Sequence, residues 1–199
     1  LYRVTDAGRR EAEPITPDVG AGALRFADFV LDPSRERLLA VREDHRGSGE
    51  AVNTIVAVPL AGGEGHVLLS GADFYSAPRL SPDGRKIAWL SWNHPNMPWD
   101  GMDLWLADVR DDGVLGPAEH VAGSATNWTT QPAWSPDGTL VFVDERTGWL
   151  NLYRRLDGGR DQPLAPAEAE FAWPEWQFAA HSYGFDADGR IVAVVRRGG

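Results

Sequence analysis

Two acidic stretches of the chain carry carboxylates placed where they could bind a ligand. Glu43 and Asp44 end an apolar run, and Glu175 stands between Trp173 and Trp176. A fixed carboxylate forms a charge-assisted hydrogen bond with an ammonium group, so these acids could bind the N-terminal amine of a peptide. Solvated acids are also common at strand ends, and the sequence leaves both interpretations open.

A loop that runs from residue 92 to residue 100 mixes aromatic, thioether and polar side chains. This composition suits a partly apolar binding surface, and the candidate residues are Trp92, His94, Met97, Trp99 and Asp100. The same side chains could instead fold over the neighbouring strands, as most loop aromatics do. His94 has no second metal ligand at a usable spacing, so we expect neither a metal site nor a cofactor.

The pattern of a nucleophilic serine is missing from the sequence. The strand–turn–helix elbow that exposes such a serine has the sequence Gly-x-Ser-x-Gly, and the closest approach, Gly47-Ser48-Gly49, lacks that spacing. Asp186 and Asp188 resemble the start of a calcium loop, but the rest of the EF-hand spacing is missing. We therefore expect no catalytic residue in this chain.

Composition argues against several classes of function. The formal net charge is −10, with 29 acidic and 19 basic residues, which disfavours a nucleic-acid-binding surface. No apolar stretch approaches the roughly 18 residues of a membrane span, so we expect no membrane segment. The chain has no cysteine, which excludes disulfides and fits a reducing, cytoplasmic setting.

The strands that must position these residues recur along the chain. Four segments align at residues 31–35, 80–84, 134–138 and 185–189, at steps of about 50 residues, and each is followed by an apolar run. Two of them contain Ser-Pro-Asp-Gly, in which proline presets φ, aspartate accepts local backbone hydrogen bonds and glycine supplies positive φ. The motif predicts a hairpin turn between antiparallel strands.

A second short segment, which begins with Leu or Ile, alternates with the first set along the chain, at residues 1–3, 55–57, 104–106 and 152–154. Four strands in about fifty residues is typical of a β-propeller blade, whereas a two-sheet sandwich would not repeat with this period. We predict an all-β fold, a partial β-propeller of four-stranded antiparallel blades. The predicted complete blades span residues 24–70, 71–122 and 123–166, and the part-blades span 1–23 and 167–199.

Three blades and two part-blades do not obviously close a ring, since closed propellers carry about four to eight blades. The chain is predicted to begin at a third strand and to end after a second strand. We therefore expect it to be an arc of a larger propeller.

Several stretches resemble the N-terminal propeller of serine peptidases of the prolyl oligopeptidase (S9) family, in particular the dipeptidyl aminopeptidase and acylaminoacyl-peptidase branch. The most specific is His94-Pro-Asn-Met-Pro-Trp-Asp100, which follows the similar stretch 77–92. Further matches lie at residues 42–45, 144–153, 170–176 and 182–185. The Ser-Pro-Asp-Gly turn is less specific, because TolB-like propellers also contain it.

The resemblance implies a propeller that gates and selects short peptide substrates. In that family a C-terminal α/β-hydrolase domain of the same polypeptide holds the serine, aspartate and histidine triad, and that domain is not in this chain. Recognition of amines by propeller acids is a theme of the family's dipeptidyl peptidases, which favours Glu43, Asp44 and Glu175. A homo-oligomer is compatible with the sequence. The alternative is a non-catalytic TolB-like propeller that binds a protein partner.

Overall fold

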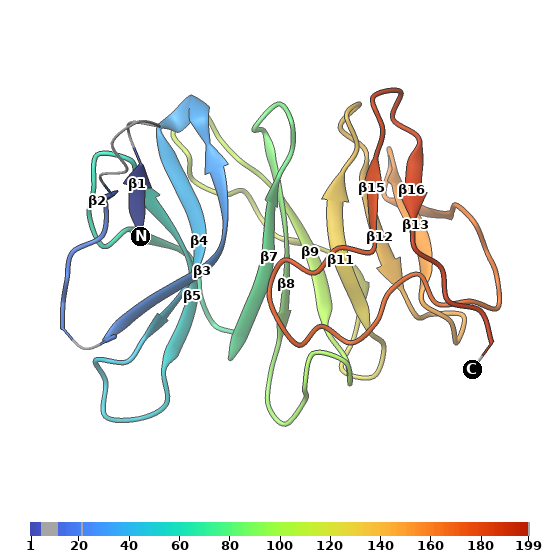
Figure 1. Cartoon of the computed structure of the whole chain (residues 1–199), viewed down its shortest axis with the longest axis horizontal. Helices are drawn as coiled ribbons and strands as arrows, with labels where there is room; N and C mark the ends of the chain where they lie inside the picture. The colour runs from blue at the N-terminus through green and yellow to red at the C-terminus, as the bar shows by residue number, and fades with distance from the viewer. Residues whose placement is uncertain (5–11, 21, 199) are drawn as a thin grey trace.

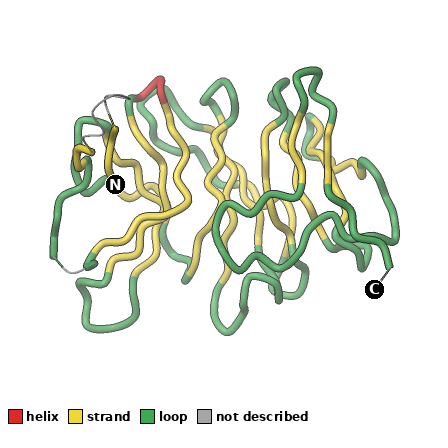
Figure 2. The backbone as a smooth tube through the Cα atoms, viewed as in Figure 1, coloured by secondary structure: helices red, strands yellow, loops and turns green. Residues whose placement is uncertain are grey.

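The computed structural model describes residues 1–4, 12–20 and 22–198 and arranges them as five antiparallel β-sheets, set side by side along the longest axis (Figure 1). Within these residues the one helical element is the 3₁₀ turn η1 (Pro33–Arg35), and strands and loops form the remainder (Figure 2). No helix in the described part of the chain has the length and apolarity needed to cross a membrane.

Three of the sheets have four strands, and consecutive strands pair in each. They consist of β3 (Leu24–Asp32), β4 (Arg37–Asp44), β5 (Val52–Pro59) and β6 (His66–Leu69); of β7 (Phe74–Leu80), β8 (Lys86–Trp92), β9 (Asp103–Asp108) and β10 (Glu119–Gly123); and of β11 (Thr129–Trp134), β12 (Leu140–Asp144), β13 (Asn151–Leu156) and β14 (Arg160–Pro163). The other two sheets pair β1 (Tyr2–Val4) with β2 (Ala12–Pro14), and β15 (Tyr183–Phe185) with β16 (Ile191–Ala193). The predicted all-β class with four-stranded antiparallel blades is confirmed.

The central strands are buried on both faces, because each sheet packs between its neighbours. Successive residues of a strand point to opposite faces. In β4, Leu39 and Val41 join Trp89 of the next blade in one hydrophobic core, while Leu38 packs with Ile15 in another. This two-sided burial explains why the apolar runs of the sequence are continuous rather than alternating.

The Ser-Pro-Asp-Gly turns form as predicted. The Ser81 N–H donates to the carbonyl of Lys86 at 2.8 Å, the Ser81 hydroxyl donates to Asp83 at 2.6 Å, and Gly84 has φ +68°. The first aligned segment has no glycine, and it forms η1 instead. Its left-handed residue is Glu36, with φ +48°, one position later than the glycine of the other turns.

The first strand of each four-stranded blade also contains a β-bulge that the sequence did not reveal. The residue in the bulge is left-handed although it is not glycine: Asp28, Ala77 and Gln131 have φ values of +47°, +50° and +52°. Hydrogen bonds between blades hold these positions. Asp28 Oδ2 accepts the N–H of Ala77 at 2.5 Å, and Gln131 Oε1 accepts the N–H of Ser182 at 2.8 Å.

Two left-handed glycines differ in the space around them and give a matched test of the blade packing. A Cβ on Gly123 would collide with the Met102 carbonyl and the Thr129 side chain, whereas Gly138 has no such neighbour within 4 Å. We expect Gly138→Ala to lose about 1–2 kcal/mol of unfolding free energy through backbone strain. Gly123→Ala should lose a further ~1–3 kcal/mol through overpacking. Urea unfolding measures both values, and equal losses would contradict the packing described for β10.

Candidate functional site

The candidate residues lie at one edge of the blades, which we call the loop face. Antiparallel connectivity places the turns β3–β4, β7–β8 and β11–β12 at the opposite edge. In Figure 1 the β7–β8 turn lies at the upper edge, and the loop between β8 and β9 lies at the lower edge. The long segment between β14 and β15, residues 164–182, crosses in front of β7 and β11 and so returns to earlier blades.

A pocket of about 280 Å³ opens where this returning segment meets β7 and the loop after β8. We call it the aromatic pocket, because its walls are mostly ring-bearing side chains. It is lined by Ser76, Trp92, Pro98, Glu175, Trp176, Gln177 and Phe178. Two candidates from the sequence, Trp92 and Glu175, are therefore brought together although they are far apart along the chain.

Glu175 is the one acidic side chain in the lining of this pocket. Its Oε1 accepts a hydrogen bond of 2.5 Å from the Thr130 hydroxyl, and its Oε2 accepts none from the residues that the structure describes. Burial raises the pKa of the Glu175 carboxyl above its usual value. The Thr130 hydrogen bond and the charge of Arg79 act in the opposite direction, while Asp28 adds to the increase. A partly desolvated carboxylate with one free oxygen can accept a cationic donor.

The two loop aromatics differ in their surroundings, since Trp92 lines the aromatic pocket and Trp99 does not. The rings of Trp99 and Trp176 lie 4.5 Å apart, tilted by 44°, which joins the loop to the returning segment. The rings of Trp92 and Phe74 stack at 5.3 Å and 18°. Both alternatives left open by the sequence thus hold for Trp92, since it packs against its neighbour and faces the aromatic pocket.

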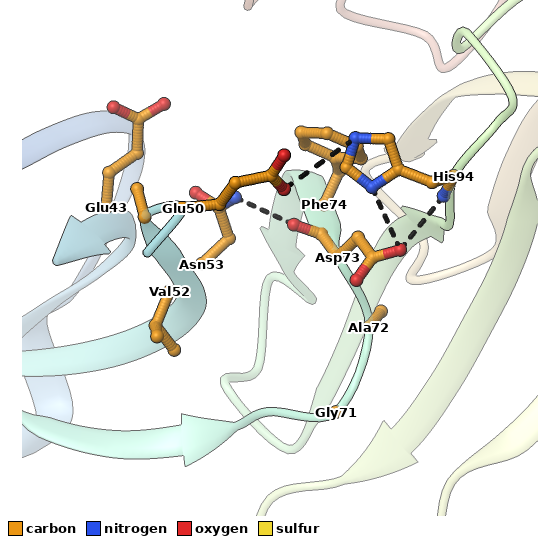
Figure 3. A pocket seen from close by; sticks show the side chains of 10 residues that line it. Glu43, Glu50, Val52, Asn53, Gly71, Ala72, Asp73, Phe74 and His94 are labelled. Atoms are coloured by element: carbon orange, nitrogen blue, oxygen red, sulfur yellow. Dashed lines mark hydrogen bonds and ion pairs between the residues drawn. The ribbon is translucent and has the colours of Figure 1, made fainter. Parts of the chain in front are cut away.

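His94 lies in a second pocket on the loop face, which we call the acidic pocket (Figure 3). Its Nδ1 lies 3.2 Å from Asp73 Oδ2, and its backbone N–H donates to the same oxygen at 2.9 Å. On the other side of the ring, Nε2 lies 4.0 Å from Glu50 Oε2, and the Phe74 ring lies at 4.8 Å. No group of three metal-ligating side chains occurs among the described residues.

Glu43 and Asp44 differ in how free they are to bind a ligand. Glu43 lines the acidic pocket but stands apart from His94 in Figure 3, and its carboxylate bonds to His45 at 2.9 Å. Asp44 has both carboxylate oxygens on the Arg46 guanidinium, at 2.9 and 2.6 Å. These bonds hold the pKa of Asp44 at about 2. Arg46 also reaches Glu64 at 3.0 Å, so this motif ties the loop to the outer part of the blade.

The third blade repeats this Asp-x-Arg motif. Arg146 bonds to Asp144 at 2.7 Å and to Asp161 at 2.9 Å. In both blades the aspartate belongs to the residue pair that lies nearest the loop face in the hairpin of the first two strands. In the second blade Trp92 occupies the position of that aspartate, and His94 occupies the position of the arginine. The second blade therefore lacks the motif at the point where its loop contributes to both pockets.

The remaining candidates of the loop have different surroundings. Asp100 Oδ2 accepts the N–H of Met97 at 2.8 Å, which closes a turn within the loop. Met97 is 49% exposed and lines neither pocket. Sequence reasoning missed Ser76 and Thr130, because their proximity to Glu175 depends on the return of residues 164–182. The two residues occupy equivalent positions, each one residue before a left-handed bulge, but that equivalence depends on bulges that only the structure reveals.

The chain is similar to solved structures of known proteins over nearly its whole length. The chain matches the crystal structure of puromycin hydrolase with a TM-score of 0.89 and 35% identity, over 99% of this chain and 32% of that one. It matches a puromycin-hydrolyzing peptidase of Mycobacterium tuberculosis with a TM-score of 0.88 and 34% identity, over 98% and 32%. The structure of this chain matches the propeller domain of these S9-family peptidases, as the resemblance in the sequence predicted. No family model matches the chain.

Two curated relatives are dipeptidyl-peptidases. Dipeptidyl-peptidase 5 of Porphyromonas gingivalis is 24% identical over 151 residues, which cover 73% of this chain and 22% of the relative. Dipeptidyl-peptidase 5 of Trichophyton equinum is 35% identical over 81 residues, 38% of this chain and 10% of the relative. The propeller segment thus spans about a third of the solved chains and a smaller share of the curated ones. A putative TolB of Agrobacterium tumefaciens, at 18% identity and a TM-score of 0.58, shares the fold alone.

The Asp44–Arg46 pair predicts a measurable titration. Removing the guanidinium in Arg46→Ala should raise the pKa of Asp44 from about 2 toward the ~3.9 of a free aspartate, observed by carboxyl-carbon NMR. Because the folded pKa lies below the unfolded one, the pair stabilises the fold above about pH 4, and this stabilisation is lost as the pH falls toward 2. Arg25→Ala, which removes a neighbouring arginine that pairs with Glu43, is the control. An unchanged Asp44 titration in Arg46→Ala would contradict the assignment.

Proposed function

We propose that this chain is the substrate-selecting propeller of a serine peptidase that acts on short peptides. The catalytic triad belongs, in this proposal, to an α/β-hydrolase domain of the same polypeptide. The observation that carries the proposal is the 35% identity to puromycin hydrolase over 99% of the chain, which spans only 32% of that protein. The rest of the solved relative leaves ample length for a second domain.

Within this proposal the aromatic pocket receives the first residue of the substrate, and Glu175 binds its ammonium group. The free Oε2 of Glu175 is the acceptor, and Thr130 fixes the carboxylate in position through Oε1. Partial burial strengthens the attraction between the two charges, because less water screens them. The ring-bearing walls supply apolar area for a substrate side chain.

The acidic pocket extends the same proposal along the loop face. Glu43, Glu50 and Asp73 give this region a negative potential that attracts cationic peptide ends. His94 orients Asp73 through the two hydrogen bonds at 2.9 and 3.2 Å. The solved relatives are named for hydrolysis of puromycin, so puromycin belongs among the substrates to assay. A TolB-like role in partner binding is a weaker fit, because that similarity is limited to the fold.

Glu175→Gln in the complete polypeptide tests the proposal. A charge-assisted hydrogen bond contributes about 1.5–3 kcal/mol, so KM for peptides with a free N-terminus should rise roughly 10–100-fold. N-acetylated peptides, which carry no ammonium, should be hardly affected. As the pH falls through the raised pKa of Glu175, the wild-type carboxylate becomes neutral and its KM for free-amine peptides should rise. Glu175→Gln should lack this pH dependence.

Glu168→Gln is the matched control, since Glu168 is an exposed acid of the same returning segment outside the aromatic pocket. It should leave KM unchanged. An equal loss on free and acetylated peptides in Glu175→Gln would contradict amine binding by Glu175. Lack of any peptidase activity in the complete polypeptide would contradict the proposed function itself.

A further inference from the structure

The floor of the aromatic pocket holds a hydroxyl without a partner. Ser76 is 4% exposed, which makes it the most buried residue of the lining. Its Oγ is buried and has no hydrogen-bond partner among the described residues. Buried polar groups are nearly always hydrogen-bonded, so this hydroxyl is available to pair with a polar ligand atom that enters the pocket.

The repeat shows that this hydroxyl is specific to the pocket. Thr130 occupies the equivalent position in the third blade, one residue before the left-handed bulge, and its hydroxyl donates to Glu175. The corresponding residue of the first blade is Ala27, which has no hydroxyl. Hydroxyls therefore occur at this position in the two blades whose inner strands contact Glu175 or line the aromatic pocket.

The walls and the size of the pocket define what reaches Ser76. Trp92, Trp176 and Phe178 present aromatic rings, and Pro98 adds a further apolar wall to this open pocket. A volume of about 280 Å³ lies at the lower end of the ~300–1,000 Å³ range of small-molecule sites, so it suits one ring-bearing residue rather than an extended peptide. Aromatic rings pack well in such surroundings, in offset or edge-to-face geometry.

We propose that the aromatic pocket selects tyrosine-like side chains, rings with a polar atom at the far end, and that Ser76 is the residue that determines this specificity. The inference rests on the proposed function, which assigns this pocket to substrate. A tyrosine hydroxyl in the pocket pairs with Ser76 Oγ, whereas a phenylalanine ring leaves Ser76 buried and unpaired. Sites built to hydrogen-bond a ligand hydroxyl discriminate against the analogue that lacks it.

Calorimetric titration of the chain with two small probes tests the inference. We expect N-acetyl-tyrosinamide to bind about tenfold more tightly than N-acetyl-phenylalaninamide, the difference made by one buried hydroxyl left unpaired. In Ser76→Ala the two probes should bind equally, through weaker binding of the tyrosine probe. Removal of an unpaired buried hydroxyl should not lower the thermal midpoint of the chain. Ser48→Ala, an exposed serine of another loop, should keep the preference.

A variant of the pocket wall separates general binding in the pocket from the preference for tyrosine. Trp176, 79% exposed at the pocket mouth, forms part of the wall for either ring. Trp176→Ala should therefore weaken both probes by a similar factor and leave the preference for tyrosine intact. Equal binding of the two probes to the wild-type chain would overturn the inference. A tyrosine preference that survives Ser76→Ala, or binding of neither probe, would also overturn it.

The acetylated probes keep this test independent of the proposed function. They carry no ammonium, so Glu175 makes no charge-assisted bond with them, and they need no catalytic domain. A tyrosine preference lost in Ser76→Ala would support the specificity residue even if the polypeptide proved inactive as a peptidase. Conversely, peptidase activity with equal binding of the two probes would support the function and overturn the role of Ser76.

Discussion

A four-stranded blade has two apolar faces and can bury neither by itself. In this chain the blades cover one another, so that Leu39 and Leu38, adjacent in β4, belong to different hydrophobic cores. Hydrogen bonds from bulge residues then fix blades against their neighbours: Ala77 donates to Asp28, and Ser182 donates to Gln131. The loop face depends on this packing, because its two pockets form between blades or beneath a segment that returns to earlier ones.

The parts of the fold that local chemistry determines could be predicted from sequence. Ser81, Asp83 and Gly84 form their turn with bonds inside one hairpin, and the apolar runs follow from burial on both faces. The bulges at Ala77 and Gln131 could not be predicted, because residues about fifty positions away help to hold their left-handed conformations. The order of residue types along a single strand does not reveal such a contact between distant parts of the chain.

The candidate site shows the same division. Residue type alone identified Glu175 and Trp92 as candidates, but their meeting depends on the path of residues 164–182 across β7 and β11 (Figure 1). Alignment of the repeats reveals a difference between the blades that single positions do not show. Two blades carry the Asp-x-Arg motif at the end of the inner hairpin, and the second blade has Trp92 and His94 there instead. Loss of that motif leaves this loop to pack with the returning segment and enclose the aromatic pocket.

The central claim is that the loop face of the second blade receives the first residue of a short substrate. The most direct measurement is a crystal structure of the complete polypeptide with a non-hydrolysable peptide that begins with tyrosine. The account predicts the ring between Trp92 and Trp176, and the ammonium group within hydrogen-bond distance of Glu175. A peptide bound elsewhere, with the aromatic pocket empty, would contradict it.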